Sequence, residues 1–202
     1  MTIIFSSVII DRRQIFVDCS NWATALAMLC FRGQARHDSG EGYKSLIADY
    51  VRSGHPEAIF LDATLGEVGE RPLSESDYIS RLKIAAAGDF PPALVQLSSA
   101  YYSGDEIPQN RKLAADLLRK AAELGHLEAQ TLVGQELCFA EGEFKRRGLQ
   151  LIEQAANRKY CKALEILARF HEHGELGLGK NPQMVADFRR RALESDSVVG
   201  CE

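Results

Sequence analysis

The sequence is poor in the features that usually reveal a chemical activity. Aromatic residues make up only 8% of its 202 residues, and 24 basic side chains nearly balance 28 acidic ones. That balance leaves no basic footprint of the kind that binds nucleic acid. No G-x-S-x-G nucleophile motif is present, and the apolar run at residues 1–10 is too short to span a bilayer. We therefore expect neither a nucleic-acid partner nor a membrane anchor.

Cysteine pairing motifs are also missing. The five cysteines are scattered, none lies in a C-x-x-C, and the sequence has no N-x-S/T glycosylation sequon. These absences favour a reducing compartment, so we expect a cytoplasmic protein in which Cys30 and Cys161 are buried as small apolar residues. Residues 1–10 also lack the basic start of a signal peptide. The alternative is a secreted or periplasmic regulatory factor whose first segment is cleaved near residue 20.

Two short motifs suggest chemistry but lack the residues or the setting that it requires. Residues 174–181 match seven of the eight positions of a phosphate-binding loop, yet Asn181 replaces the magnesium-binding hydroxyl and a helix replaces the preceding strand. His171 and His173 are two residues apart, so on a helix they point to different faces. The sequence therefore predicts no catalytic residue, no metal site and no cofactor.

The sequence does contain an internal repeat, which is clearest at its turns. The segments GHPEA, GDFPPA, GHLEA and KYCKA end at Ala58, Ala93, Ala129 and Ala163, and Ala23 opens an earlier unit. Successive alanines are therefore 35, 35, 36 and 34 residues apart. A period in the mid-thirties is typical of a helical solenoid, in which each unit is a pair of antiparallel helices.

The unit at residues 93–128 shows the helix pair most clearly. Leu97 and Tyr101 share the apolar face of a first helix. Asn110 is the expected N-cap of a second helix, and Gly125 is the expected residue of positive φ that ends it.

These units resemble Sel1-like repeats, which are relatives of the tetratricopeptide repeats. The pattern is carried by Leu97-Ser98-x-x-Tyr101-x-x-Gly104 and is echoed by Leu167-Ala168-x-x-His171-x-x-Gly174. The resemblance implies an all-α fold, an α/α solenoid of about five helix-turn-helix repeats over residues 21–195. The repeats fall near residues 23–57, 58–92, 93–128, 129–162 and 163–195, and a flexible tail follows at residues 196–202. Because members of the family are mostly adaptors, the resemblance also implies protein binding rather than catalysis.

The first 20 residues differ from the repeats. β-Branched and aromatic residues gather at residues 3–5, 8–10 and 15–17, and the polar segment DRRQ separates the last group from the others. This pattern predicts a short β-hairpin, or one strand with an extended arm. Because solenoids need their open ends shielded, we interpret residues 1–20 as an N-terminal cap on the first repeat.

The working surface of such a solenoid is expected on its concave side, which the first helices line. Small residues at Ser98, Gly134 and Ala168 should let the first helices pack closely together. Positions two and five residues beyond the tight-packing leucine should then face the groove, with Glu165 in the same stripe. The predicted partner-binding residues are Met28, Phe31, Ser99, Tyr102, Gln135, Cys138, Glu165, Arg169 and Glu172. Tyr102 and Arg169 are favoured because their residue types are enriched at binding hot spots.

The sequence therefore predicts an adaptor that holds a partner protein or peptide in this groove. A narrower hypothesis, drawn by analogy from the resemblance, is a bacterial immunity protein that neutralises a toxin or secreted effector. The competing class is an enzyme whose site is built from the N-terminal cap and the loop at residues 33–42. The sequence shows no recurring carboxylate or histidine cluster in support of an enzyme.

Overall fold

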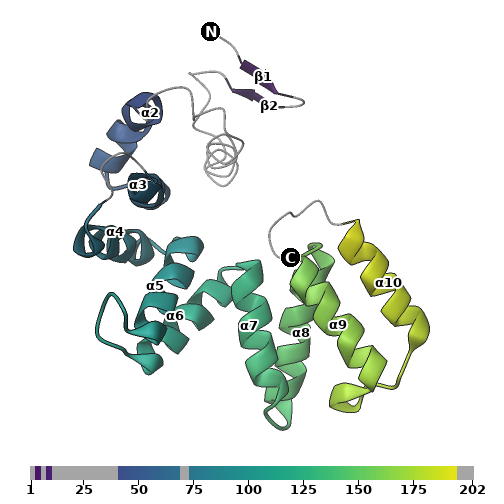
Figure 1. The fold of residues 1–202 in the computed structure, drawn as a ribbon. Helices are drawn as coiled ribbons and strands as arrows, with labels where there is room; N and C mark the ends of the chain where they lie inside the picture. The colour runs from purple at the N-terminus through teal and green to yellow at the C-terminus, as the bar shows by residue number, and fades with distance from the viewer. Residues whose placement is uncertain (1–2, 6–7, 11–40, 69–72, 195–202) are drawn as a thin grey trace. The chain divides into compact units, whose positions relative to one another are not determined.

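The computed structural model describes residues 3–5, 8–10, 41–68 and 73–194 of the chain (Figure 1). Apart from one two-stranded sheet, the regular structure of these residues is helical. The elements are β1 (Ile3–Phe5), β2 (Val8–Ile10), α2 (Glu41–Arg52), α3 (Pro56–Val68), α4 (Glu75–Ala87), α5 (Pro91–Ser103), α6 (Arg111–Glu123), α7 (Leu127–Cys138), α8 (Glu143–Asn157), α9 (Cys161–His173), the 3-10 turn η2 (Glu175–Gly177) and α10 (Pro182–Leu193). The chain divides into two compact units, residues 1–93 and 94–202.

The predicted hairpin is present, although its turn lies earlier than the sequence suggested. β1 and β2 pair in antiparallel register, with Ile3 opposite Ile10 and Phe5 opposite Val8. The chain therefore reverses between these two strands and not at the polar segment DRRQ. The third predicted extended group, the start of the first predicted repeat, most of the predicted loop at residues 33–42 and the predicted tail at residues 196–202 lie outside the described residues.

The first unit contains an ion pair at a position where other repeats carry leucine. Asp62 of α3 occupies the place of the buried Leu97 and Leu167, four residues after the repeat alanine. Its carboxylate lies 2.5 Å from the guanidinium of Arg81 on α4. The ion pair satisfies the charge, and α3 keeps the register of the repeat, because Ala63 in the next position is fully buried.

Three helix pairs build the second unit: α5 with α6, α7 with α8, and α9 with α10. Figure 1 shows α7, α8, α9 and α10 lying side by side, and each packs against its neighbour in the chain. Asn110 caps α6, because its Oδ1 accepts a hydrogen bond of 3.0 Å from the backbone N–H of Leu113. α6 runs without a break to Glu123, as predicted. The alternation of first and second helices confirms the predicted all-α repeat.

The turns between pairs explain the sequence period. One residue in each turn has a positive φ, and it always stands four residues before the repeat alanine. These residues are Gly54 (φ +81°), Asp89 (φ +60°), Gly125 (φ +84°) and Lys159 (φ +61°). The alanines that follow are fully buried, so the turn and the packing of the next first helix recur together.

The small residues of the first helices have a different role from the predicted one. Ser98 donates a hydrogen bond of 2.8 Å to the carbonyl oxygen of Ala114 on α6. A Cβ atom placed on Gly134 would lie 2.8 Å from the carbonyl oxygen of Gly148 on α8. Ser98 and Gly134 therefore bring α5 and α7 close to the second helix of their own pair. The prediction that they pack first helices on one another was wrong.

Candidate functional site

A hollow lies between α7 and α9, the first helices of neighbouring pairs. Its volume is about 210 Å³, and we call it the α7–α9 hollow. It is lined by Glu128, Thr131, Leu132 and Gln135 from α7, and by Tyr160, Lys162, Glu165 and Ile166 at or just before α9. Two of the predicted site residues, Gln135 and Glu165, therefore come together in one depression on the first-helix side.

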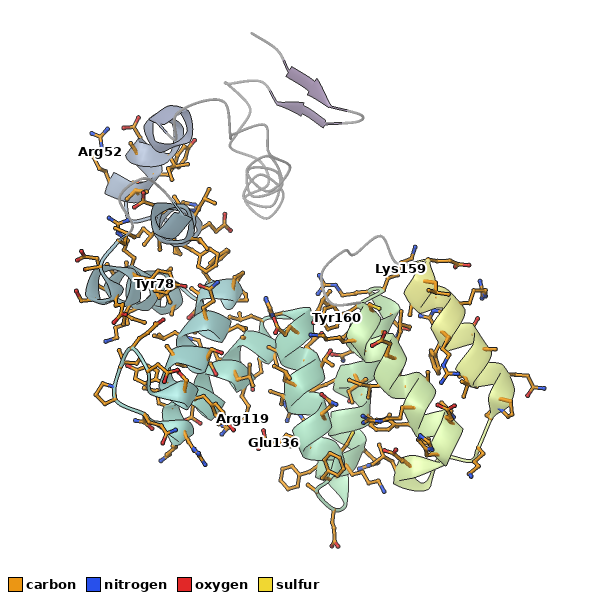
Figure 2. The ribbon with its side chains drawn as sticks, viewed as in Figure 1. Arg52, Tyr78, Arg119, Glu136, Lys159 and Tyr160 are labelled. Carbon is orange, nitrogen blue, oxygen red and sulfur yellow. The ribbon has the colours of Figure 1, made fainter. Side chains whose placement is uncertain are left out.

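The lining of the α7–α9 hollow combines apolar and polar groups. Leu132 and Ile166 supply aliphatic surface, and 44% of Leu132 is exposed. Tyr160 stands where the end of α8 turns into α9 (Figure 2). Burial raises the pKa of Tyr160, and the carboxylate of Glu128 raises it further, so the phenol stays protonated and can donate a hydrogen bond. A partner side chain of moderate size would find apolar contact, a hydroxyl and charges of both signs there.

The exposed face of α7 extends the hollow with a second apolar group. Phe139 follows the last residue of α7 in helical conformation and is 77% exposed. It lies seven residues, about two turns, beyond Leu132, so the two side chains share one face with Gln135 between them. Neither apolar residue was predicted, because neither lies two or five residues beyond the tight-packing position, which is Val133 in this helix. Their signal was the helical spacing of Leu132, Gln135 and Phe139, whose shared face is rotated by about 100° from that of the buried Ala129 and Val133.

Predicted positions two residues beyond the tight-packing leucine do lie at the surface. Ser99 of α5 and Arg169 of α9 are exposed, and Gln135 is half-buried. Arg169 lies one turn beyond Glu165 on α9, with its guanidinium carbon 5.4 Å from the ring centre of Phe170. Its Nε atom is 3.8 Å from Glu175, a long contact that leaves the guanidinium open to a partner.

Positions five residues beyond the leucine face the second helix of their own pair. The ring of Tyr102 lies 5.6 Å from the guanidinium carbon of Arg111 on α6, and Glu172 pairs with Arg189 of α10 at 2.8 Å. Cys138 is only 2% exposed and packs beside Gly148 on α8, so the prediction that it faces a groove was wrong. The two sets of positions differ in direction because they are three residues apart, and three residues fall about 60° short of a full helical turn. That rotation turns the later position toward the second helix.

Other candidate residues prove to be structural. His171 is half-buried and stacks on Phe188 at 5.8 Å, in the place of the packing tyrosine. Asn181 caps α10 by accepting a hydrogen bond of 3.2 Å from the backbone N–H of Met184, so residues 174–181 form a helix-entry loop. In the part of the chain that the structure describes, no three His, Cys, Asp or Glu side chains are placed to hold a metal ion. Met28 and Phe31 lie outside that part.

The cysteines depart from the expectation in one respect. Cys161 is buried, as predicted, but it is also disulfide-bonded. Cys138 is the free cysteine among the described residues, and burial raises the pKa of its thiol, which disfavours the reactive thiolate. None of the described helices combines the length and the apolar character needed to cross a bilayer.

Helix pairs that recur every 34 to 36 residues define the class of α-helical repeat solenoids. The family model for the Sel1 repeat matches residues 91–126 and 161–184. A Sel1 repeat protein from Oxalobacter formigenes superposes with a TM-score of 0.69 at 19% identity, covering 85% of this chain and 71% of that one. The chain thus contains Sel1-like repeats, and the solenoid built from its helix pairs is similar to that of known Sel1 repeat proteins.

Two further solved structures resemble this chain less strongly. The protective antigen c5321 of uropathogenic Escherichia coli, which displays an SLR fold, has a TM-score of 0.62 at 15% identity, with 85% of this chain covered but only 41% of the antigen. The immunity protein Pa5087 of Pseudomonas aeruginosa has a TM-score of 0.43 at 17% identity, with 68% and 65% coverage. The first likeness shows the fold alone, and the second is too low to carry an argument. No curated protein sequence matches the chain.

Proposed function

We propose that this protein binds a partner protein on the first-helix side of its second unit, at the α7–α9 hollow. The observation that carries the proposal is the exposed pair Leu132 and Phe139 beside that hollow. Fully burying an aliphatic or aromatic side chain of this size contributes about 1.5–3 kcal/mol, so both side chains together would anchor a partner. The Sel1 repeat fold, which is generally used for protein–protein interaction, supports the same function.

The charges around the hollow indicate how a partner would be oriented. Glu128 and Glu165 stand near Lys162, and Arg169 lies one turn further along α9. A partner that places an apolar side chain in the hollow would meet acidic groups at the hollow and a basic group beyond it. Rim charges of this kind set orientation and association rate more than affinity.

A differential capture experiment tests the proposal. The wild-type protein, the variant Leu132→Ser/Arg169→Glu and the control Leu124→Ser are immobilised and exposed to lysate of the source organism. Leu124 is the C-cap residue of α6 and is 46% exposed, which matches the 44% of Leu132. We expect a protein that the wild type and the control retain and the hollow variant loses, with at least tenfold weaker binding.

Two outcomes would contradict the proposal. One is retention of every captured protein by the hollow variant, and the other is loss of the same proteins by the Leu124→Ser control. Melting temperatures of the three proteins should agree within a few degrees, which separates lost binding from lost folding. Neutralisation of a toxin or effector is the narrower form of the proposal, and co-expression of the captured protein with and without this chain tests it.

A further inference from the structure

A second depression, larger than the first, lies on the side of the second helices. It has a volume of about 910 Å³ and is lined mainly by α6 and α8, with Gln130 of α7 among the lining residues. We call it the α6–α8 trough. Polar and charged side chains dominate its lining, unlike the mostly apolar pockets that hold small molecules. It belongs to neither the α7–α9 hollow nor the exposed face of α7.

Gln130, which lines the trough, is polar at a position where the other repeats carry an apolar residue. The equivalent residues, one position after the repeat alanine, are Ile59, Leu94 and Leu164, and all three are buried and apolar. Gln130 is equally buried, at 7% exposure, but its Oε1 atom accepts no hydrogen bond from the described protein. A buried acceptor without a donor destabilises a fold. Core packing therefore does not explain why a glutamine stands at this position.

The neighbouring side chains define what could satisfy this amide. The Nε2 atom of Gln130 lies 3.4 Å from Oε1 of Gln154, so the donor end of Gln130 is used within the protein. The Nε2 atom of Gln154 and the whole amide of Gln150 remain available at the trough. The trough therefore contains an acceptor, Oε1 of Gln130, next to the amide donors of Gln154 and Gln150. A peptide main chain could pair with these groups, because its N–H groups donate and its C=O groups accept hydrogen bonds.

The charges that line the trough do not indicate whether its ligand is acidic or basic. Arg146 and Arg147 line the trough together with Glu123, Glu143 and Glu153. Two positive and three negative groups give no strong preference for an acidic or a basic ligand. An uncharged, extended segment suits this lining, because its affinity would come from main-chain hydrogen bonds.

We propose that the α6–α8 trough binds an extended peptide segment through its main chain. Oε1 of Gln130 is itself buried beneath the trough, so the exposed side chain of Gln154 must turn aside when the peptide binds. One main-chain N–H of the peptide then donates to Oε1 of Gln130, and a main-chain carbonyl accepts from Nε2 of Gln154. This site is separate from the partner surface proposed above, so either can fail without the other.

The test uses matched peptides and the full chain labelled with ¹⁵N. The first peptide is an acetylated and amidated dodecamer of alternating glycine and serine. The second has the same sequence with every glycine N-methylated, which removes those main-chain donors. We expect the first peptide to shift the side-chain amide signals of Gln130 and Gln154, with little dependence on salt, and the N-methylated peptide to bind at least tenfold more weakly.

Variants locate the contact and keep the test independent of folding. Gln130→Leu restores the residue type of the sibling repeats, so it should keep or raise the melting temperature while weakening peptide binding at least tenfold. Gln154→Ala should weaken binding and slightly lower the melting temperature, because Nε2 of Gln130 loses its acceptor. Gln135→Leu, on the opposite face, should leave peptide binding unchanged. Absence of shifts with the first peptide, equal binding of the N-methylated peptide, or full binding by Gln130→Leu would overturn the proposal.

Discussion

α7 and α8 approach each other closely at Gly148, and adding one methyl group there should loosen the pair. A Cβ atom on Gly148 would lie 2.6 Å from the carbonyl oxygen of Gly134 and 2.7 Å from the backbone nitrogen of Cys138. Carbon atoms do not approach backbone atoms this closely in folded proteins. The obstructing atoms belong to the backbone of α7, so a rotamer change cannot relieve the contact, and the helices must move apart.

Two effects of Gly148→Ala oppose each other. Alanine in a helix interior is favoured over glycine by about 1 kcal/mol. Overpacking a tight contact costs about 1–3 kcal/mol, and a rigid backbone obstacle places this site at the upper end of that range. We therefore expect the free energy of unfolding to fall by about 1–2 kcal/mol, although helix propensity alone would raise it.

Equilibrium unfolding in urea measures this change, and thermal melting checks it. The control is Ser99→Ala, an exposed site on α5, where the higher helix propensity of alanine should slightly raise stability. For a chain of this size, a loss of 1 kcal/mol lowers the melting temperature by about 2–4 °C. If Gly148→Ala stabilised the protein as Ser99→Ala should, the close approach of α7 and α8 would not exist in solution.

Three further substitutions test other features of the repeat. Lys159→Gly removes a non-glycine residue from the left-handed region and should raise the free energy of unfolding by about 1 kcal/mol in urea titration. Ala121→Leu should cost about 1–3 kcal/mol because Ala121 is fully buried, whereas Ala186→Leu at an exposed site of α10 should cost little. Burial lowers the pKa of His126, the N-cap of α7, so the unfolded chain binds its proton more readily. Stability should therefore fall as the pH drops below about 6.5, and His126→Asn, which keeps a cap acceptor, should reduce that loss in melts across pH.

The fold could be predicted because the repeat fixes both turns and core. Ala58, Ala93, Ala129 and Ala163 recur at nearly constant spacing, and each occupies the same buried position after a turn with positive φ. That recurrence is visible in the sequence without any knowledge of the partner helices. The substitution of glycine by Lys159 weakened the signal of one turn but did not change its conformation.

The site was harder to predict because it depends on helix rotation and on the neighbouring pair. Gln135 is half-buried and Glu165 is exposed, and both line the α7–α9 hollow, where partner binding stays a prediction. Cys138 was misplaced because a step of three residues turned it toward α8. Leu132 was missed because it is not one of the positions that the repeat pattern assigned to the groove, yet it is 44% exposed and lines the α7–α9 hollow.

Departures from the repeat gather in the α7–α8 pair. Gln130 replaces a buried leucine, and the small positions of this pair are both glycine, whereas the equivalent positions carry Ser98 with Ala114 in the preceding pair. α8 has 15 residues, against 13 in α6 and 12 in α10. Phe139 is exposed at the turn that joins the two helices. The buried Gln130, the paired glycines and the exposed Phe139 each work against local stability or solubility. Their concentration in one pair, bordered by both the hollow and the trough, is what selection for the proposed binding at this pair would leave.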